Sequence, residues 1–188
     1  MRGLLPFAYA IDRLNVLVGR TAMWLVLVAV LVSAANATVR YALHTSSNAW
    51  LELQWYLFAA VFLLCAGYTL LRNEHVRIDI LTSHLSKRTR TWIDILGALF
   101  FLLPMAVLIG WLSWPGFVDS WMRNETSSDA GGLIRWPAKL LIPAGFLLLT
   151  LQAISEIIKR IAFLRGEGPD PAPDKGGPHG QDASDVVA

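Results

Sequence analysis

Residues 95–118 read ILGALFFLLPMAVLIGWLSWPGFV and carry no charged side chain. An α-helix rises about 1.5 Å per residue, so about 20 apolar residues cross the ~30 Å of hydrocarbon in a bilayer. A helix is also the conformation in which one segment satisfies all of its own backbone hydrogen-bonding groups in lipid. This stretch is therefore predicted to span a membrane.

Three further uncharged runs lie on either side of it, at residues 21–39, 53–71 and 140–155. Hydrophobic residues make up 55% of the 188-residue chain and charged residues 16%, whereas a soluble domain carries about 25% charge. We expect an all-α integral membrane protein with four transmembrane helices, at about residues 21–41, 50–71, 95–118 and 137–158.

The distribution of positive charge predicts the orientation, because cytoplasmic loops retain Lys and Arg. Most of the 16 Lys and Arg residues fall in the N-terminal segment, the connection after the second run and the C-terminal segment, which four spans would place on one side. The opposite side has only Arg40, Arg123, Arg135 and Lys139. Both termini are expected in the cytoplasm.

The segments around this membrane domain, residues 21–160, differ in character. Residues 1–20 form an amphipathic pattern that suits a helix lying in the inner interface, with a flexible leader as the alternative. The connection at residues 72–94 is expected to lie along the membrane as a short helix. Residues 161–188 are expected to be a disordered cytoplasmic tail, because from residue 166 onward Gly and Pro are frequent and aromatic residues are absent.

A competing interpretation concerns processing of the N-terminus. The apolar stretch before Ala35-Asn36-Ala37 resembles a signal peptide with an A-x-A cleavage site, which would leave three spans. Such a leader would be longer than the usual 15–30 residues, which favours retention of the first span.

The span interiors exclude several kinds of chemistry, because they contain no Asp, Glu, Lys, Arg or His. All four histidines lie in loops or the tail, so axial haem ligands at depth are not expected. Cys65 is the one cysteine, which excludes a disulfide centre, and a net charge of +2 does not suit a nucleic-acid binder. We expect no catalytic residue, no cofactor, no metal site and no enzyme activity in this chain.

Residues 66–79, AGYTLLRNEHVRID, closely resemble the signature that follows the second span in the small permease subunit of tripartite ATP-independent periplasmic (TRAP) transporters, the DctQ type. Glu52 beside aromatic residues matches that family's acidic residue early in span two. Residues 125–132, Pro137 and residues 142–149 are similar to its third loop and last span. Together these segments cover about residues 20–160 in the family's order.

The resemblance implies a role that composition alone does not supply. It implies a small scaffold subunit of a sodium-driven, binding-protein-dependent importer of organic acids, in particular carboxylates and among them 2-oxoacids, in a bacterial inner membrane. The implied partners are a DctM-type large permease subunit, where sodium would bind, a DctP-type periplasmic binding protein, and membrane lipids. The alternative is a structural or assembly membrane protein unconnected with transport.

Two sets of residues are candidates for contacts within such a complex. Glu52 would pair with Arg40 or with the large subunit, and a solvated interfacial carboxylate is the alternative. His75 and Asp79 are four residues apart and would share a helix face. They would pair with each other, cap the end of the second span or bind the large subunit, and a solvated loop is the alternative. The candidates for the large-subunit interface or a structural role are Glu52, His75, Arg77 and Asp79, and those for docking of the binding protein are Arg123, Glu125, Asp129 and Arg135.

Overall fold

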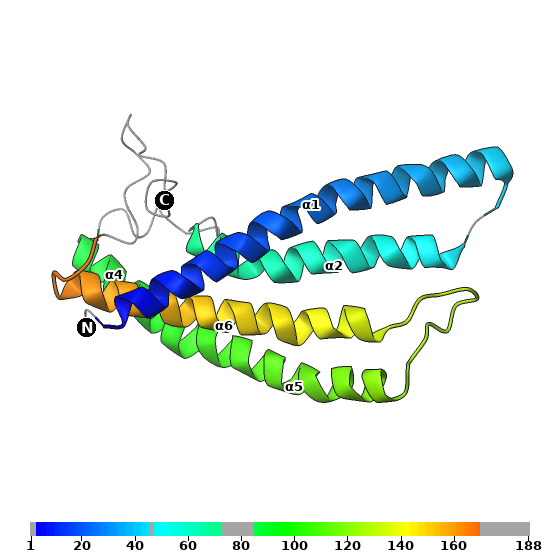
Figure 1. Cartoon of the computed structure of the whole chain (residues 1–188). Helices are drawn as coiled ribbons and strands as arrows, with labels where there is room; N and C mark the ends of the chain where they lie inside the picture. The colour runs from blue at the N-terminus through cyan, green and yellow to red at the C-terminus, as the bar shows by residue number, and fades with distance from the viewer. Residues whose placement is uncertain (1–2, 46, 73–84, 170–188) are drawn as a thin grey trace.

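The protein is a bundle of long helices (Figure 1). The computed structural model describes residues 3–45, 47–72 and 85–169. Within these ranges the elements are α1 (Leu5–Leu43), α2 (Asn48–Leu71), α4 (Lys87–Gly97), the π-helical turn η1 (Ala98–Leu102), α5 (Leu103–Met122) and α6 (Trp136–Leu164). Four helical rods among the described residues are long and apolar enough to cross a membrane, which confirms the predicted all-α membrane fold with four spans.

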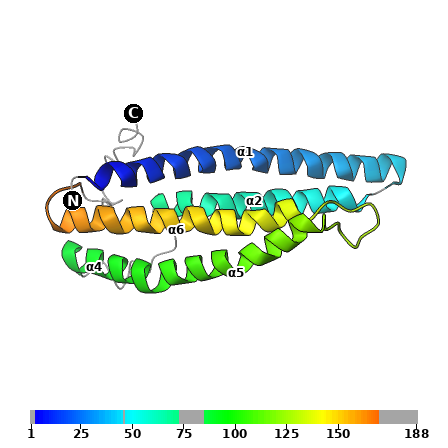
Figure 2. The same cartoon turned by 60° about the horizontal axis from the view of Figure 1, so that its bottom comes forward.

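Helix α6 lies at the centre of the bundle. It packs against α1, α2, α4 and α5, while α1 and α2 also pack against each other (Figures 1 and 2). A Cβ atom added to Gly145 of α6 would lie 2.7 Å from the backbone carbonyl oxygen of Leu63 in α2, so this glycine permits the close approach of the two helices. Small residues allow such backbone contact, which is how helices gain packing energy in lipid.

The two ends of the bundle carry different parts of the described chain. At one end α1 begins at Leu5 and α6 ends at Leu164, and we call it the terminal end (Figure 1). The other end carries the connections from α1 to α2 and from α5 to α6, and we call it the loop end. Large apolar side chains such as Phe62, Phe101 and Trp111 are exposed along the rods between these ends, as expected of surfaces that face lipid or another membrane subunit.

Helix α1 differs from the expected arrangement, since residues 5–20 continue directly into the first span. Its 39 residues correspond to about 58 Å of helix, roughly twice the hydrocarbon thickness. Pro6 stands in its first turn, where a missing N–H costs no hydrogen bond and the fixed φ suits a helix. Helix α6 likewise continues past the expected boundary at residue 160, to Leu164.

The third span is also longer than the expected residues 95–118. Helices α4 and α5 join through η1 into one rod from Lys87 to Met122, so residues 87–94 do not form a separate helix. The wider turn at η1 has a local cause in Pro104, which lacks the N–H that would bond the carbonyl of Phe100. The N–H of Leu103 bonds the carbonyl of Ala98 instead, five residues back.

Candidate functional site

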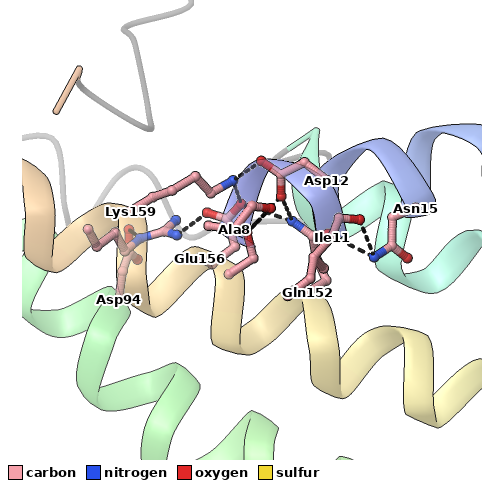
Figure 3. A network of polar contacts seen from close by, with 10 residues as sticks. Ala8, Ile11, Asp12, Asn15, Asp94, Gln152, Glu156 and Lys159 are labelled. Carbon is pink, nitrogen blue, oxygen red and sulfur yellow. Dashed lines mark hydrogen bonds and ion pairs between the residues drawn. The ribbon is translucent and has the colours of Figure 1, made fainter. Parts of the chain in front are cut away.

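Two polar clusters join the helices, one at each end of the bundle. The first, the terminal-end network, connects α1, α4 and α6 (Figure 3). Its members are Asp12, Asn15, Asp94, Gln152, Ser155, Glu156, Lys159 and Arg160.

Asp12 of α1 is the acceptor at the centre of this network. Its Oδ1 accepts from Gln152 Nε2 and from Ser155 Oγ, each at 2.8 Å, and its Oδ2 lies 2.9 Å from Lys159 Nζ. The whole residue is 8% exposed, so this charge depends on its protein partners for solvation. Three α6 side chains therefore hold the first half of α1 against α6.

Gln152 is fully buried and uses all of its hydrogen-bonding groups. Its Nε2 donates to Asp12 and, at 3.3 Å, to Glu156, while its Oε1 accepts from Asn15 Nδ2 at 2.9 Å. The Oδ1 of Asn15 faces Gly67 of α2, where an added Cβ would lie 2.2 Å from this oxygen. A side chain at position 67 would therefore displace the Asn15 amide from its place in the network.

Charged groups extend the network toward α4. Glu156 bonds both Lys159 and Arg160, and Arg160 Nε lies 3.4 Å from an oxygen of Asp94 in α4. Glu156 and Arg160 are 2% and 4% exposed. Removing one member of a buried pair leaves an uncompensated charge, so this arrangement stabilises one specific packing of the three helices.

The terminal-end network was not among the sequence-predicted sites. Its α6 members, at positions 152, 155, 156, 159 and 160, are spaced by three, one, three and one residues and so form one polar stripe at helical spacing. Asp12 and Asn15 form a matching pair on α1. This spacing is the signal that indicates the network, although the sequence does not show which helices face each other.

The second cluster, the loop-end cluster, ties α2 to the loop between α5 and α6. Asn48, Glu52 and Tyr56 stand four residues apart on one face of α2. Asn48 Nδ2 donates to the carbonyl of Ala130 at 3.2 Å, and Tyr56 OH donates to that of Ile134 at 3.1 Å. These contacts fix the loop over the end of α2.

Glu52 is the central residue of the loop-end cluster and is 5% exposed. One carboxylate oxygen accepts from the Ser127 hydroxyl, and the other accepts from the Leu133 N–H at 2.6 Å. The expected pair with Arg40 is not formed. Arg40 lies beside Gln54 and Leu51, on a different side of α2 from the face that Glu52 presents to the loop.

The loop itself is a folded turn. Thr126 and Ile134 form an isolated antiparallel bridge, and the N–H of Ser127 bonds the carbonyl of Leu133 at 2.9 Å. Gly131 adopts a positive φ of 74°, a conformation that glycine reaches without steric cost.

Three of the predicted docking residues contribute to this structure in different ways. The Glu125 carboxylate pairs with Lys139, and this pairing holds the pKa of Glu125 below its ordinary value. The backbone carbonyl of Glu125 accepts a hydrogen bond from the N–H of Arg135 at 2.8 Å. Arg123 pairs instead with Asp119, at 2.7 Å on an exposed surface. The structure brings Glu125 and Arg135 together and leaves Arg123 in a separate pair.

The remaining predicted site residues divide into two groups. Asp129 is exposed on the loop, where its N–H bonds the Ser127 hydroxyl at 3.3 Å. His75, Arg77 and Asp79 lie outside the described residues. Within residues 3–45, 47–72 and 85–169, no group of three or more His, Cys, Asp and Glu side chains is arranged to hold a metal ion.

Four apolar rods whose polar contacts gather mostly at the two ends define an all-α, multi-pass membrane protein. The family model described as "Tripartite ATP-independent periplasmic transporters, DctQ component" matches residues 29–163. This match covers more than half of the chain, so the protein belongs to that family and is a small permease subunit of a TRAP transporter. It confirms the resemblance seen in residues 66–79. Searches of curated proteins and of solved structures found no match.

Proposed function

We propose that this chain is the scaffold subunit of a sodium-driven importer of organic acids, and that it works with a DctM-type large subunit and a DctP-type binding protein in a bacterial inner membrane. Membership of the DctQ family supports this role. The single observation that carries it is the location of the buried charged groups, which bond helix to helix or helix to loop and leave the apolar faces of the rods exposed.

The location of these charged groups supports a scaffold role for this chain and a transport role for the large subunit. A residue that carried an ion or solute through the membrane would have to change partners during transport, whereas Asp12 and Glu52 are saturated by contacts within the chain. The exposed faces of α1 and α5 supply packing surface for lipid and for the large subunit. Sodium and the carboxylate substrate, which includes 2-oxoacids in this proposal, would bind in the large subunit.

Substrate uptake in reconstituted vesicles tests this role. Vesicles with the large subunit, the binding protein and this chain should accumulate a carboxylate under a sodium gradient, and vesicles without this chain should not. Uptake that is unchanged without this chain would show that transport does not require it as a scaffold. Sustained uptake by this chain alone would contradict the scaffold role.

Two surfaces are proposed for contact with the partners. His75, Arg77 and Asp79 are proposed to bind the large subunit, so His75→Ala should weaken co-purification. At the loop end, Arg123 and Asp129 are exposed and are proposed to meet the binding protein, with Glu125 and Arg135 supporting the loop. Charge reversal at Asp129 should alter the salt dependence of docking, because rim charges affect the encounter rate most.

A further inference from the structure

A groove of about 530 Å³ runs between the loop-end halves of α1 and α2. Its polar lining comes from Ser33, Asn36 and Arg40 on α1, from His44 directly after the end of α1, and from Gln54 on α2. The three α1 residues are spaced by three and four positions, so they form one stripe along the helix. Neither the family match nor the two polar clusters accounts for this stripe.

Arg40 is the main charged group of the groove. Its side chain is exposed and makes no hydrogen bond or ion pair with another residue in the described part of the chain. The acidic residue nearest in sequence on α2, Glu52, is committed to Ser127 and Leu133. No carboxylate lines the groove, so its charge is complementary to an anion.

The depth of the stripe identifies the kind of anion. Arg20 and Arg40 bracket the uncharged part of α1, and 20 residues of helix measure about 30 Å, the thickness of the hydrocarbon core. Arg40 therefore stands at the level of the lipid phosphates at the loop end. Asn36 lies about 6 Å deeper along the helix, and Ser33 about 10 Å deeper.

The order of groups along this stripe matches the order of groups in a phospholipid. Arg40 stands nearest the loop end, the Asn36 amide and then the Ser33 hydroxyl lie deeper, and below Ser33 the helix exposes Val30 and Leu31. Polar side chains at acyl-chain depth are costly unless they find hydrogen-bond partners, and lipid ester oxygens are acceptors at that depth.

We infer that this groove binds one phospholipid of the loop-end leaflet. Arg40 holds its phosphodiester, and the amides of Asn36 and Gln54 donate to its ester oxygens. The exposed side chains of Tyr41 and Leu51 border the groove, so it opens sideways toward the bilayer, from which a lipid can enter.

Native mass spectrometry of the full chain tests this site. The chain is reconstituted with its co-purifying subunits in vesicles of phosphatidylethanolamine and phosphatidylglycerol, then released in mild detergent. One phospholipid should remain bound to the wild-type chain, and Arg40→Gln should reduce its occupancy by about tenfold, the effect of one charge-assisted hydrogen bond. Asn36→Leu combined with Gln54→Leu should also reduce it, and excess inorganic phosphate should not displace the lipid.

Two variants control for folding and for general loss of charge. Arg40→Lys keeps the cation and should retain the lipid. Arg123→Gln removes an exposed arginine at the same end of the bundle and should leave occupancy unchanged. The inference would be overturned if Arg40→Gln retained the lipid fully, or if Arg40→Gln and Arg123→Gln lost it equally. It would also be overturned if the lipid were present on the isolated chain but absent from the assembled complex.

Discussion

The carboxylate of Glu52 accepts a hydrogen bond from the backbone N–H of Leu133 at 2.6 Å, across 81 positions of sequence. Its other oxygen accepts from the Ser127 hydroxyl, so one side chain in the first turns of α2 holds both sides of the turn between α5 and α6. The position of the loop surface therefore depends on this carboxylate.

Replacement of Glu52 should loosen the loop. Glu52→Ala removes the acceptor for Leu133, and we expect the Leu133 amide to exchange hydrogen at least about tenfold faster, because protection follows the local opening equilibrium. Hydrogen-exchange mass spectrometry of the loop peptides measures this effect. Asp129→Ala is the matched control, since the Asp129 carboxylate is exposed on the same loop. Equal protection in wild type and Glu52→Ala would show that the other contacts of the loop hold it without this carboxylate.

Gly132→Ala should destabilise the loop-end cluster through overpacking. The new Cβ would lie 2.4 Å from the Ser127 Cβ and 2.9 Å from an oxygen of Glu52, so the loop must move. We expect a loss of about 1–3 kcal/mol in the free energy of unfolding, measured by denaturation in detergent. Gly116→Ala is the control, because nothing lies within 4 Å of its added Cβ and alanine favours a helix. A similar loss for both variants would argue against the close contact.

Asp12→Ala should weaken the attachment of α1 to α6. It leaves Gln152, Ser155 and Lys159 without their shared acceptor in a buried site, and breaking such a network costs about 3 kcal/mol. Unfolding in detergent measures the total loss, and limited proteolysis before residue 20 should become faster. Arg13→Ala, an exposed neighbour on the same helix, should leave both unchanged. The prediction fails if the two variants behave alike.

The pair between Glu125 and Lys139 predicts a pH dependence of stability. The bonded ammonium of Lys139 holds the pKa of Glu125 below its ordinary value of 4.5. Because the pKa is lower in the folded than in the unfolded state, the pair stabilises the fold above pH 4.5, and this contribution is lost as the pH falls through the folded-state pKa.

Unfolding of wild type and Glu125→Gln between about pH 3 and 7 measures this contribution. The two proteins should differ at neutral pH and converge in acid. In a Lys139→Met background the Glu125→Gln change should have little effect at any pH, since the partner is already absent. A constant difference across the range would mean that the ionised carboxylate is not what stabilises the loop.

The four spans were predictable because their signal is local. Residues 95–118 and the three other uncharged runs are each apolar enough to require lipid or protein around them, whatever their neighbours are. The helix ends were less predictable. Residues 5–20 carry Asp12, Arg13 and Arg20, and charge within an apolar pattern suggested an interfacial segment. The helix continues because α6 supplies partners for Asp12.

The polar clusters were also less predictable than the spans, because their contacts join residues far apart in the sequence. Glu52 was singled out from its position early in α2, but its partners are loop groups far along the chain, one of them a backbone N–H that no side-chain pattern reveals. The contact between Asp12 and Gln152 joins positions 140 residues apart and depends on which faces α1 and α6 present to each other. Only the packing of the helices joins the two halves of each contact.

The unbroken course of α1 has a practical consequence for imaging a membrane protein this small. The helix begins at Leu5, and within two turns Asp12 fixes it to α6. A compact helical carrier domain fused in phase ahead of Leu5 would therefore sit as a rigid handle, heavy enough to align particles in electron cryomicroscopy without touching the loop surface at the far end.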